Sequence, residues 1–337
     1  MKKWQWILGL LISFSGCWNL TTVQAEQNHY NVQAILPKNQ VNQESNFFDI
    51  LVHPGQTQIL TIKINNQDQQ SHQYNITTNL AITGPSGNII YNQNVKKNDS
   101  SLIFNVSTAT SPINTVTVPA KKAWLIHLKT KIPKKQFPGI ALGGINVVQH
   151  AAETNGKNVQ IRNQFAYTIG VQLRETKKLT VIPYMNLKTV TPVQINYKNY
   201  IAANLQNPRA VIMHHLFVSS YITKKAQHKK LWQTTGKDMT MAPNSNFNFL
   251  IGDGSKPLTA GNYTLHLKAS AENGKYNWKT AKHFTISKQQ AATIQTTNTS
   301  QIKPTTNWSL IGILIGIIVI LLGLIIWMLF KKKHNKY

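Results

Sequence analysis

The sequence predicts an all-β fold, with two immunoglobulin-like β-sandwich domains in tandem followed by one C-terminal transmembrane helix. From residue 26 to about residue 288, short apolar runs alternate with turn clusters roughly every 8 to 12 residues, which is the pattern of sandwich strands. No long amphipathic helical stretch interrupts this pattern. Residues 308–330 then form 23 consecutive residues without a charge, enough for a membrane-spanning helix.

Individual strands are visible as alternating side chains. The run "QILTIKIN" places Leu60, Ile62 and Ile64 on one face, and "YNITTNLAI" and "AWLIHLK" alternate in the same way, as strands with one buried face do. Turns are marked by "HPGQ", "TGPSGN", "TNGK" and "ENGK". The last contains Asn273-Gly274 between two strand-like runs, and because both residues tolerate positive φ we expect a β-hairpin there.

The β-rich part divides near residues 149–160. Residues 26–150 carry 10 basic and 5 acidic side chains, whereas residues 151–288 carry 19 and 5. Both lengths suit a β-sandwich, so we expect a first domain at 26–150, near +5, and a second at 151–288, near +14. The polar, low-complexity residues 289–307 are expected to form a spacer.

The N-terminal residues 1–25 have the features of a secretory signal peptide. Lys2 and Lys3 precede an apolar run of about a dozen residues, and small side chains surround a cleavage site after Ala25. The apolar run is too short for a membrane anchor. A lipoprotein signal ending at Cys17 is the alternative, although the phenylalanine of "FSGC" fits it poorly.

Residues 308–330 are predicted to cross the membrane as one helix. At about 1.5 Å per residue they span a hydrocarbon core of about 30 Å, and Trp308 and Trp327 lie near its two interfaces. The lysine-rich tail, 331–337, is placed in the cytoplasm by the positive-inside rule. We therefore expect a single-pass protein of the cell membrane with its N-terminal domains extracellular.

Cysteine usage indicates the compartment. The single cysteine, Cys17, lies in the signal peptide, so the mature chain forms no intramolecular disulfide, whereas extracellular eukaryotic modules of this size often carry them. A signal, no disulfide and a C-terminal anchor together indicate the outer face of a Gram-positive bacterium. The run "QIKPTTNWSL" has no LPxTG-type sorting motif, so we expect the anchor to stay in the membrane.

The chain is strongly basic, with 36 basic and 10 acidic residues and a formal net charge of +26. Such a charge often indicates nucleic acid, but the export signal argues against that partner. Teichoic acids and anionic lipid head groups are the polyanions outside a Gram-positive cell, and their attraction is screened beyond a Debye length of about 8 Å. Charge that serves solubility alone is the alternative.

The residue inventory argues against an enzyme. The ten carboxylates are scattered, with no close pair like that of a glycosidase, and no G-x-S-x-G motif occurs. His214 and His215 are adjacent, and neighbours in a strand point to opposite faces, so they are not expected to chelate one metal. Asp253 in "IGDGSKP" is interpreted as a turn residue. We expect no catalytic residues, no metal and no cofactor.

Three glycines interrupt an apolar run in "PKKQFPGIALGGINVV", residues 133–148. Gly139 follows a proline and is expected in a turn, where positive φ costs glycine little. Gly143 and Gly144 lie inside the strand and indicate a bulge, or the close approach of another chain or a packed side chain. We predict that this strand closes the first domain and that the three glycines are candidate contacts.

Lysines supply the other candidate contacts. Lys134 and Lys135 precede the glycine-rich strand and are candidates for meeting a phosphate or a carboxylate, with a solvated turn as the alternative. The second domain contributes four further candidates, Lys224, Lys225, Lys229 and Lys230. In "MAPNSNFNF", Phe247 and Phe249 alternate like core residues, which favours a strand over a recognition loop.

Some stretches are more specific than a β pattern. They are "YNVQAILPKNQ", "FFDILVHPGQTQILTIKINN" and "FPGIALGGINVV", then "QFAYTIGVQLRE", "NLQNPRA", "MAPNSNFNFLIGDG" and "LTAGNYTLHLKASAENGKYNWKTAKHFTI". Together with the order of segments, they resemble the WxL-interacting proteins of lactobacilli, enterococci and relatives. The resemblance covers essentially the whole chain. Pro138 is a departure, because relatives often carry Asp before the glycine, so any ligand contact that this acid makes in the family is not expected to carry over to this chain.

The resemblance implies partners that spacing does not show. Members of the family are taken to bind proteins with WxL wall-binding domains. Their first domain is described as peptidoglycan-binding, their second as binding host or extracellular-matrix components, and no catalysis is attributed to them. The Trp-x-Leu runs of this chain, at residues 18–20 and 308–310, do not form a wall-binding module, so the chain is expected to be the partner of a WxL protein.

Three hypotheses about function follow. The first is a membrane-anchored scaffold that holds peptidoglycan together with a WxL-domain protein at the cell surface. Teichoic acid is a further candidate polymer for this scaffold. The second is an adhesin whose basic second domain binds host matrix components, and the two are compatible. The third, a wall-modifying enzyme, is opposed by the residue inventory.

Overall fold

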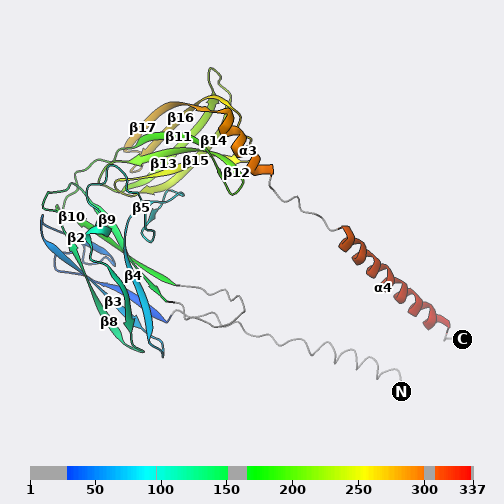
Figure 1. The fold of residues 1–337 in the computed structure, drawn as a ribbon, viewed down its shortest axis with the longest axis horizontal. Coiled ribbons are helices and arrows are strands. Elements are labelled where there is room, and N and C mark those ends of the chain that lie inside the picture. The colour runs from blue at the N-terminus through cyan, green and yellow to red at the C-terminus, as the bar shows by residue number, and fades with distance from the viewer. Residues whose placement is uncertain (1–28, 96, 151–164, 300–307, 335–337) are drawn as a thin grey trace.

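The structure is a computed structural model that describes residues 29–95, 97–150, 165–299 and 308–334. Within these ranges the chain folds into two β-sandwiches, one blue to green and one green to orange in Figure 1. The predicted all-β fold is confirmed, and the immunoglobulin-like assignment stays a prediction. The predicted signal peptide, 1–25, and its cleavage after Ala25 lie outside the described residues.

The first sandwich packs a three-stranded sheet on a five-stranded sheet. The smaller sheet has the order β1-β3-β8, with β1 at Tyr30–Ile35, β3 at Thr57–Asn66 and β8 at Ala123–Lys131. The larger has the order β2-β10-β9-β4-β7, with β2 at Phe48–Leu51, β10 at Ala166–Arg174, β9 at Ala141–Gln149, β4 at His72–Leu80 and β7 at Ile113–Val118. The short helix α2, Val106–Ala109, adds Val106 to the core between the sheets.

In β3, the apolar side chains that alternate along the sequence are the ones that the structure buries. Leu60, Ile62 and Ile64 are fully buried, and burial of such a side chain stabilises the fold by about 1.5–3 kcal/mol. In β8, Ile126 and Leu128 face the same core. Packing between the two sheets therefore fixes which face of each strand is inward.

Strand β10 extends the first sandwich beyond the predicted boundary at residue 150. It pairs antiparallel with β9 and parallel with β2, and its Val171 and Leu173 are fully buried in the first core. The glycine-rich strand β9 therefore lies in the middle of its sheet, between β10 and β4. The prediction that this strand closes the first domain was wrong, because the core needs the apolar face of β10 to be complete.

The second sandwich also has two sheets. One has the order β11-β12-β15, with β11 at Asn186–Ile195, β12 at Lys198–Asn207 and β15 at Ser245–Gly254. The other has the order β14-β13-β16-β17, with β14 at Lys230–Met241, β13 at Met213–Lys224, β16 at Gly261–Ala271 and β17 at Tyr276–Ile286. Phe247 and Phe249 are 4% and 5% exposed, which confirms them as core residues of a strand. Asn273 and Gly274 take φ of 56° and 88° in the β16–β17 turn, which confirms that hairpin.

Helix α3, Lys288–Thr299, covers the first part of the predicted spacer, residues 289–307, whose role as a spacer stays a prediction. Ser287 and Gln290 form a capping box, in which each side chain bonds the other residue's backbone N–H, at 3.1 and 2.9 Å. Ala291 and Ile294 are 7% and 9% exposed and pack on the second core. The low-complexity composition hid this helix, because two apolar residues are a weak periodic signal.

The predicted transmembrane segment falls in helix α4, Trp308–His334. In the part of the chain that the structure describes, no helix is long and apolar enough to span a membrane. The structure does not support the membrane helix, and 308–330 as an anchor stays a prediction.

The two sandwiches pack directly against each other. A small hairpin of the first, β5 (Ile82–Thr83) and β6 (Ile89–Ile90), lies between the two in Figure 1. Thr83 Oγ1 lies 2.5 Å from Ser245 Oγ and accepts a hydrogen bond from Ala242 N at 3.0 Å. A separate buried apolar cluster joins the two domains at this point, made of Ala81, Ile140, Leu142 and Ala242.

Candidate functional site

The four candidate lysines of the second domain lie at the tip of one hairpin. Lys224 ends β13, Lys230 begins β14, and Lys225 and Lys229 lie between them; all four are exposed. The backbone N–H of Lys225 donates to the carbonyl of Asn262 at 2.9 Å, which attaches the turn to the start of β16. The structure therefore gathers the four lysines into one cationic surface, called here the basic tip. Their contact with a ligand stays a prediction.

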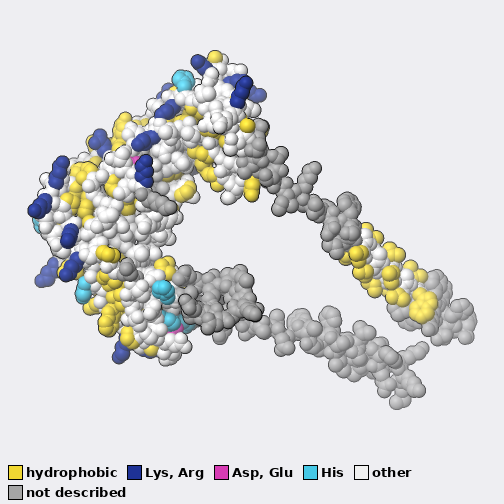
Figure 2. Space-filling view, in the orientation of Figure 1, with side chains coloured by type: hydrophobic (Ala, Val, Ile, Leu, Met, Phe, Trp, Pro, Cys, Tyr) yellow, Lys and Arg dark blue, Asp and Glu magenta, His cyan; other side chains and the backbone are white. Residues whose placement is uncertain are grey.

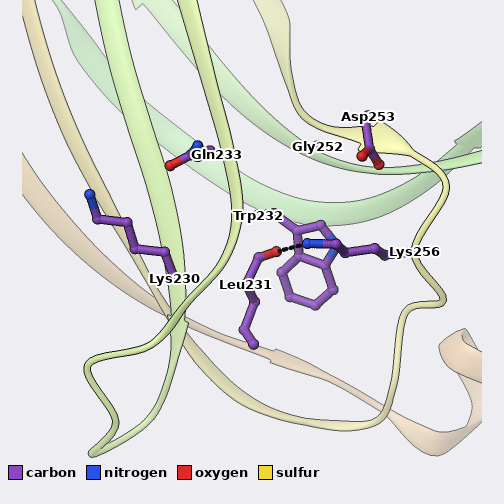
Figure 3. Close-up of a pocket in the computed structure, with 7 residues that line it drawn as sticks. All are labelled: Lys230, Leu231, Trp232, Gln233, Gly252, Asp253 and Lys256. Carbon is purple, nitrogen blue, oxygen red and sulfur yellow. Dashed lines mark hydrogen bonds between the residues drawn. The ribbon is translucent and has the colours of Figure 1, made fainter.

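A pocket of about 360 Å³ opens beside the basic tip (Figure 3). Trp232, which is 6% exposed, supplies its apolar wall. Lys256 Nζ donates to the carbonyl of Leu231 at 2.8 Å, drawn as the dashed line in Figure 3. The full lining is Lys230, Leu231, Trp232, Gln233, Gly252, Asp253 and Lys256.

The pocket holds two lysines and one carboxylate. Asp253 Oδ1 accepts hydrogen bonds from Ser255 Oγ at 2.7 Å and Ser255 N at 2.9 Å, and these bonds hold the pKa of Asp253 below its ordinary value. Asp253 is the last but one residue of β15, so its interpretation as a turn residue was wrong, although its bonds reach Ser255 just beyond the strand. Lys230 and Lys256 outnumber the single carboxylate, so the pocket carries a net positive charge.

The basic tip continues onto the outer face of the four-stranded sheet. Lys230 Nζ lies 4.8 Å from the ring centroid of Tyr221, within cation–π range. Tyr221 in turn stacks on His266, with ring centroids 4.6 Å apart and an interplanar angle of 12°. Figure 2 shows Lys and Arg side chains spread over this upper part of the molecule, with few acidic ones among them.

The two candidate lysines of the first domain lie elsewhere. Lys134 and Lys135 are exposed in the connection between β8 and β9. They belong to the first sandwich, so the structure does not join them to the basic tip. Both the ligand contact and the solvated turn are compatible with their exposure, and the contact stays a prediction.

Gly139 lies at the interface between the two sandwiches. Its φ is +67°, as expected for a turn, and a Cβ added there would lie 1.9 Å from the carbonyl oxygen of Ala210. The next residue, Ile140, donates its N–H to that same oxygen at 2.7 Å. Gly139 is therefore required for the close approach of the second domain. The backbone of Ala210, in that domain, occupies the space where a side chain at position 139 would lie.

Gly143 and Gly144 lie in a regular ladder. β9 pairs with β4 and β10 through both residues without a register shift, so no bulge forms. A Cβ at Gly143 would lie 2.7 Å from the carbonyl of Asn79, and one at Gly144 would lie 2.7 Å from Cβ of Tyr91. The close approach of packed groups is the reason for these glycines, and as ligand contacts they stay a prediction.

The sequence reasoning missed Asp99, which joins the two domains. Its Oδ1 accepts hydrogen bonds from Gln206 Nε2 at 2.7 Å and from Ser101, and its Oδ2 accepts one from Asn246 Nδ2. Burial alone would raise the pKa of Asp99, but the hydrogen bonds from Ser101, Asn246 and Gln206 outweigh it and lower that pKa. No local motif announces this role, because Gln206 and Asn246 are more than a hundred residues away in sequence.

The histidine pair does not follow the alternation expected of a regular strand, because the register of β13 shifts between Met213 and Leu216, His215 has a φ of 48°, and both side chains are exposed. The rings of His214 and His215 lie 6.5 Å apart, and His215 Nδ1 lies 2.8 Å from Asp238 Oδ1. Over the described ranges, no three His, Cys, Asp or Glu side chains gather as metal ligands.

The two packed sandwiches and the open cationic surface define a tandem β-sandwich protein of the binding class. Residues 30–149 match the family model of the WxL interacting protein peptidoglycan binding domain, and residues 156–296 match that of its host binding domain. The chain belongs to the WxL interacting protein family. The two models divide the chain between residues 149 and 156, whereas the structure assigns β10, which the second model covers, to the first sandwich.

The solved structures that match the chain at low sequence identity include chaperones. The class 5 fimbriae chaperone CfaA is 10% identical, with a TM-score of 0.30 over 76% of this chain and 98% of that chain. The E. coli chaperone DraB is 11% identical, with a TM-score of 0.28 over 76% of this chain and 95% of that chain. At these TM-scores the similarity carries no argument about function. No curated protein sequence matches the chain.

Proposed function

We propose that the protein is a non-enzymatic scaffold that holds peptidoglycan and a WxL-domain partner protein at the Gram-positive cell surface. The observation that carries the proposal is the match of two binding-domain models to consecutive parts of the chain. The packed interface supports it, because hydrogen bonds and a buried apolar cluster hold the two binding units in one arrangement.

Retention on purified ligands tests this function. The full-length chain, in mild detergent, is mixed with purified peptidoglycan and separately with a WxL-domain protein from the same cell. We expect retention on both at low and moderate salt. Lys134→Gln with Lys135→Gln should weaken only the peptidoglycan arm if these lysines meet the polymer. Retention on neither material contradicts the proposal, and released wall fragments would show an enzyme instead.

The position at the membrane is part of the same proposal. The 23 uncharged residues at 308–330 and the lysines after them support an anchor with the sandwiches outside. We expect the protein to stay with the membrane after alkaline washing and its sandwiches to be cut by protease added to protoplasts. Release by the wash would refute the anchor.

An adhesive role is the alternative function, and the basic tip favours it. Four exposed lysines on one hairpin, beside a pocket with a further lysine, provide a concentrated cationic surface. Changing Lys224, Lys225, Lys229 and Lys230 to Gln should abolish binding to host matrix components and spare binding to peptidoglycan. Equal loss of both would assign the tip to the wall instead.

A further inference from the structure

A second hollow, distinct from the pocket at the basic tip, lies on the outer face of the four-stranded sheet. It measures about 380 Å³, and three strands contribute to it: β13, β16 and β17. We call it the sheet groove. It is lined by Phe217, Lys268, Ala269, Ser270, Asn277, Trp278 and Lys279.

The sheet groove contains an uncompensated pair of cations. Lys268 and Lys279 are exposed and occupy directly opposite positions of β16 and β17. Like charges at opposite positions destabilise a sheet. Lys268 faces Ser219 on its other side, and neither lysine forms an ion pair within the described part of the chain. A pair of this kind is suited to binding one anionic group between the two ammonium groups.

The groove also presents an aromatic ring and two hydrogen-bonding side chains. Phe217 is 37% exposed on the outer face of β13, where the next side chain, that of Ser219, is polar. Ser270 is opposite Phe217, and Asn277 is opposite Ser270. Asn277 is held in place by a hydrogen bond from its Nδ2 to the carbonyl of Gly274, at 2.7 Å.

We propose that the sheet groove binds an acidic sugar unit of a linear polysaccharide. Phe217 packs against the C–H face of the sugar ring, while Lys268 and Lys279 bind its carboxylate or sulfate. Ser270 and Asn277 hydrogen-bond its hydroxyl groups. An apolar surface with a few convergent polar groups is the usual composition of a small-ligand site, and paired lysines select the acid.

The same chain would continue along β13 toward the basic tip. Tyr221 lies four residues after Phe217 on the same face, about 13 Å away at about 3.3 Å per residue. Tyr221 is flanked by His266 and Lys230. An aromatic ring beside cations therefore recurs along the strand. This proposal adds a ligand class and a binding surface to the proposed adhesive role. It depends on that role only for the assumption that the glycan comes from the host.

Calorimetry on the full-length chain in mild detergent tests the groove. The probes are heparin and hyaluronan hexasaccharides, which carry sulfate or carboxylate, with a neutral chitin hexasaccharide for comparison. We expect the acidic probes to bind and the neutral one to bind at least about tenfold more weakly. Preference for the sulfated or the carboxylated probe identifies the acid that the groove selects, whereas tighter binding of purified wall teichoic acid, a phosphate polymer, than of either probe would overturn the proposal.

Matched variants separate the groove from general attraction. Lys268→Gln with Lys279→Gln should weaken binding at least about tenfold, whereas Lys129→Gln with Lys131→Gln, which removes the same charge from exposed positions of the first sandwich, should weaken it less than about threefold. Phe217→Ser should weaken binding about fivefold even at high salt. Equal losses in the two double variants, no loss in Phe217→Ser, or no binding of any acidic probe would overturn the proposal. Unchanged thermal melting serves as the folding control.

Retention of the groove variants on peptidoglycan and on the WxL partner is measured in parallel. We expect it to be unchanged, because the groove does not enter the proposed scaffold function. Loss of saccharide binding with intact wall retention supports the groove. Absence of saccharide binding in the unchanged protein with intact wall retention refutes the groove alone.

Discussion

Gly139 shows how one residue lets two domains meet. A positive φ costs a non-glycine residue about 1–2 kcal/mol, and here the added Cβ would also lie 1.9 Å from a backbone oxygen of the second domain. Backbone cannot move aside as a flexible side chain does. The cost of a side chain at this position therefore falls on the interface as well as on the turn.

Gly139→Ala is expected to destabilise the protein by about 2–5 kcal/mol, the sum of the φ cost and of an overpacking cost of about 1–3 kcal/mol. Gly274→Ala is the matched control, because Gly274 has φ +88° but nothing within 4 Å of an added Cβ. It should cost only about 1–2 kcal/mol. Thermal and denaturant unfolding measure both, and equal costs would show that the contact with Ala210 is unimportant.

Asp99 makes the interface sensitive to acid. The folded state lowers the pKa of this carboxyl, so the folded protein holds a proton there less readily than the unfolded chain does. Its stabilisation is thus present above the unfolded-chain pKa, about 3.9, and is lost as pH falls through the lower folded value. Asp99→Asn should lower the melting temperature at about pH 7, and the difference from the unchanged protein should shrink toward about pH 3. A difference that is constant with pH contradicts this assignment.

At the scale of elements, β10 is the strand that connects the two family domains physically. Tyr30 Oη donates to the carbonyl of Phe165 at 2.6 Å, and Tyr167 Oη donates to the carbonyl of Tyr30 at 3.0 Å, so β1 and β10 hold each other. Arg174 pairs with Asp49 of β2, and both side chains are largely buried. The first sandwich is therefore completed by residues that the host-binding model also covers.

Fragments test the membership of β10. A fragment of residues 26–150 ends before β10 and should lack a cooperative transition, because Ile145 and Val147 lose the neighbouring strand that covers one side of β9. A fragment of residues 26–178 should unfold cooperatively and show a near-ultraviolet dichroism spectrum typical of fixed aromatic rings. Matching melting curves for the two fragments would place β10 outside the folding unit.

Local pattern was enough to predict most strands, and long-range pairing was not. The alternation in β3 and the Asn273-Gly274 hairpin depend on adjacent residues, so the sequence shows them directly. The run "AYTIGVQLR" of β10 alternates equally well in either sandwich, and its assignment depends on β2, more than a hundred residues earlier. The helix α3 depends on packing against the second core rather than on its own composition.

The candidate contact residues also divide into those that are close in sequence and those that only long-range pairing brings together. The four lysines of the basic tip are close in sequence, so the sequence alone is enough to identify them. The sheet groove combines Phe217, Lys268 and Lys279 from three strands, and the sequence gives no register by which to join them. Asp99 was missed for the same reason, since its partners come from the other domain.

At the scale of the whole molecule, charge is unequally divided between two packed domains. With β10 counted in the first sandwich, residues 179–288 carry 14 basic and 3 acidic side chains, or +11, and the longer range 26–178 carries 15 and 7, or +8. Because hydrogen bonds and the apolar cluster fix one sandwich against the other, we expect a polyanion of the wall to attract the second domain more strongly and so to orient the whole molecule. Salt shortens the Debye length from about 10 Å at 0.1 M to about 3 Å at 1 M, so this attraction is steeply salt-dependent.

Affinity for immobilised teichoic acid should therefore fall at least about tenfold between about 0.05 and 0.5 M salt, whereas a WxL contact through packed surfaces should change little. Lys224, Lys225, Lys229 and Lys230 changed together to Gln should lower both the affinity and its dependence on salt, because the four charges act at one place. The matched control removes four exposed lysines of the first sandwich, Lys38, Lys122, Lys129 and Lys131. If both quadruple variants lose affinity equally, the charge acts diffusely and the basic tip does not orient the molecule.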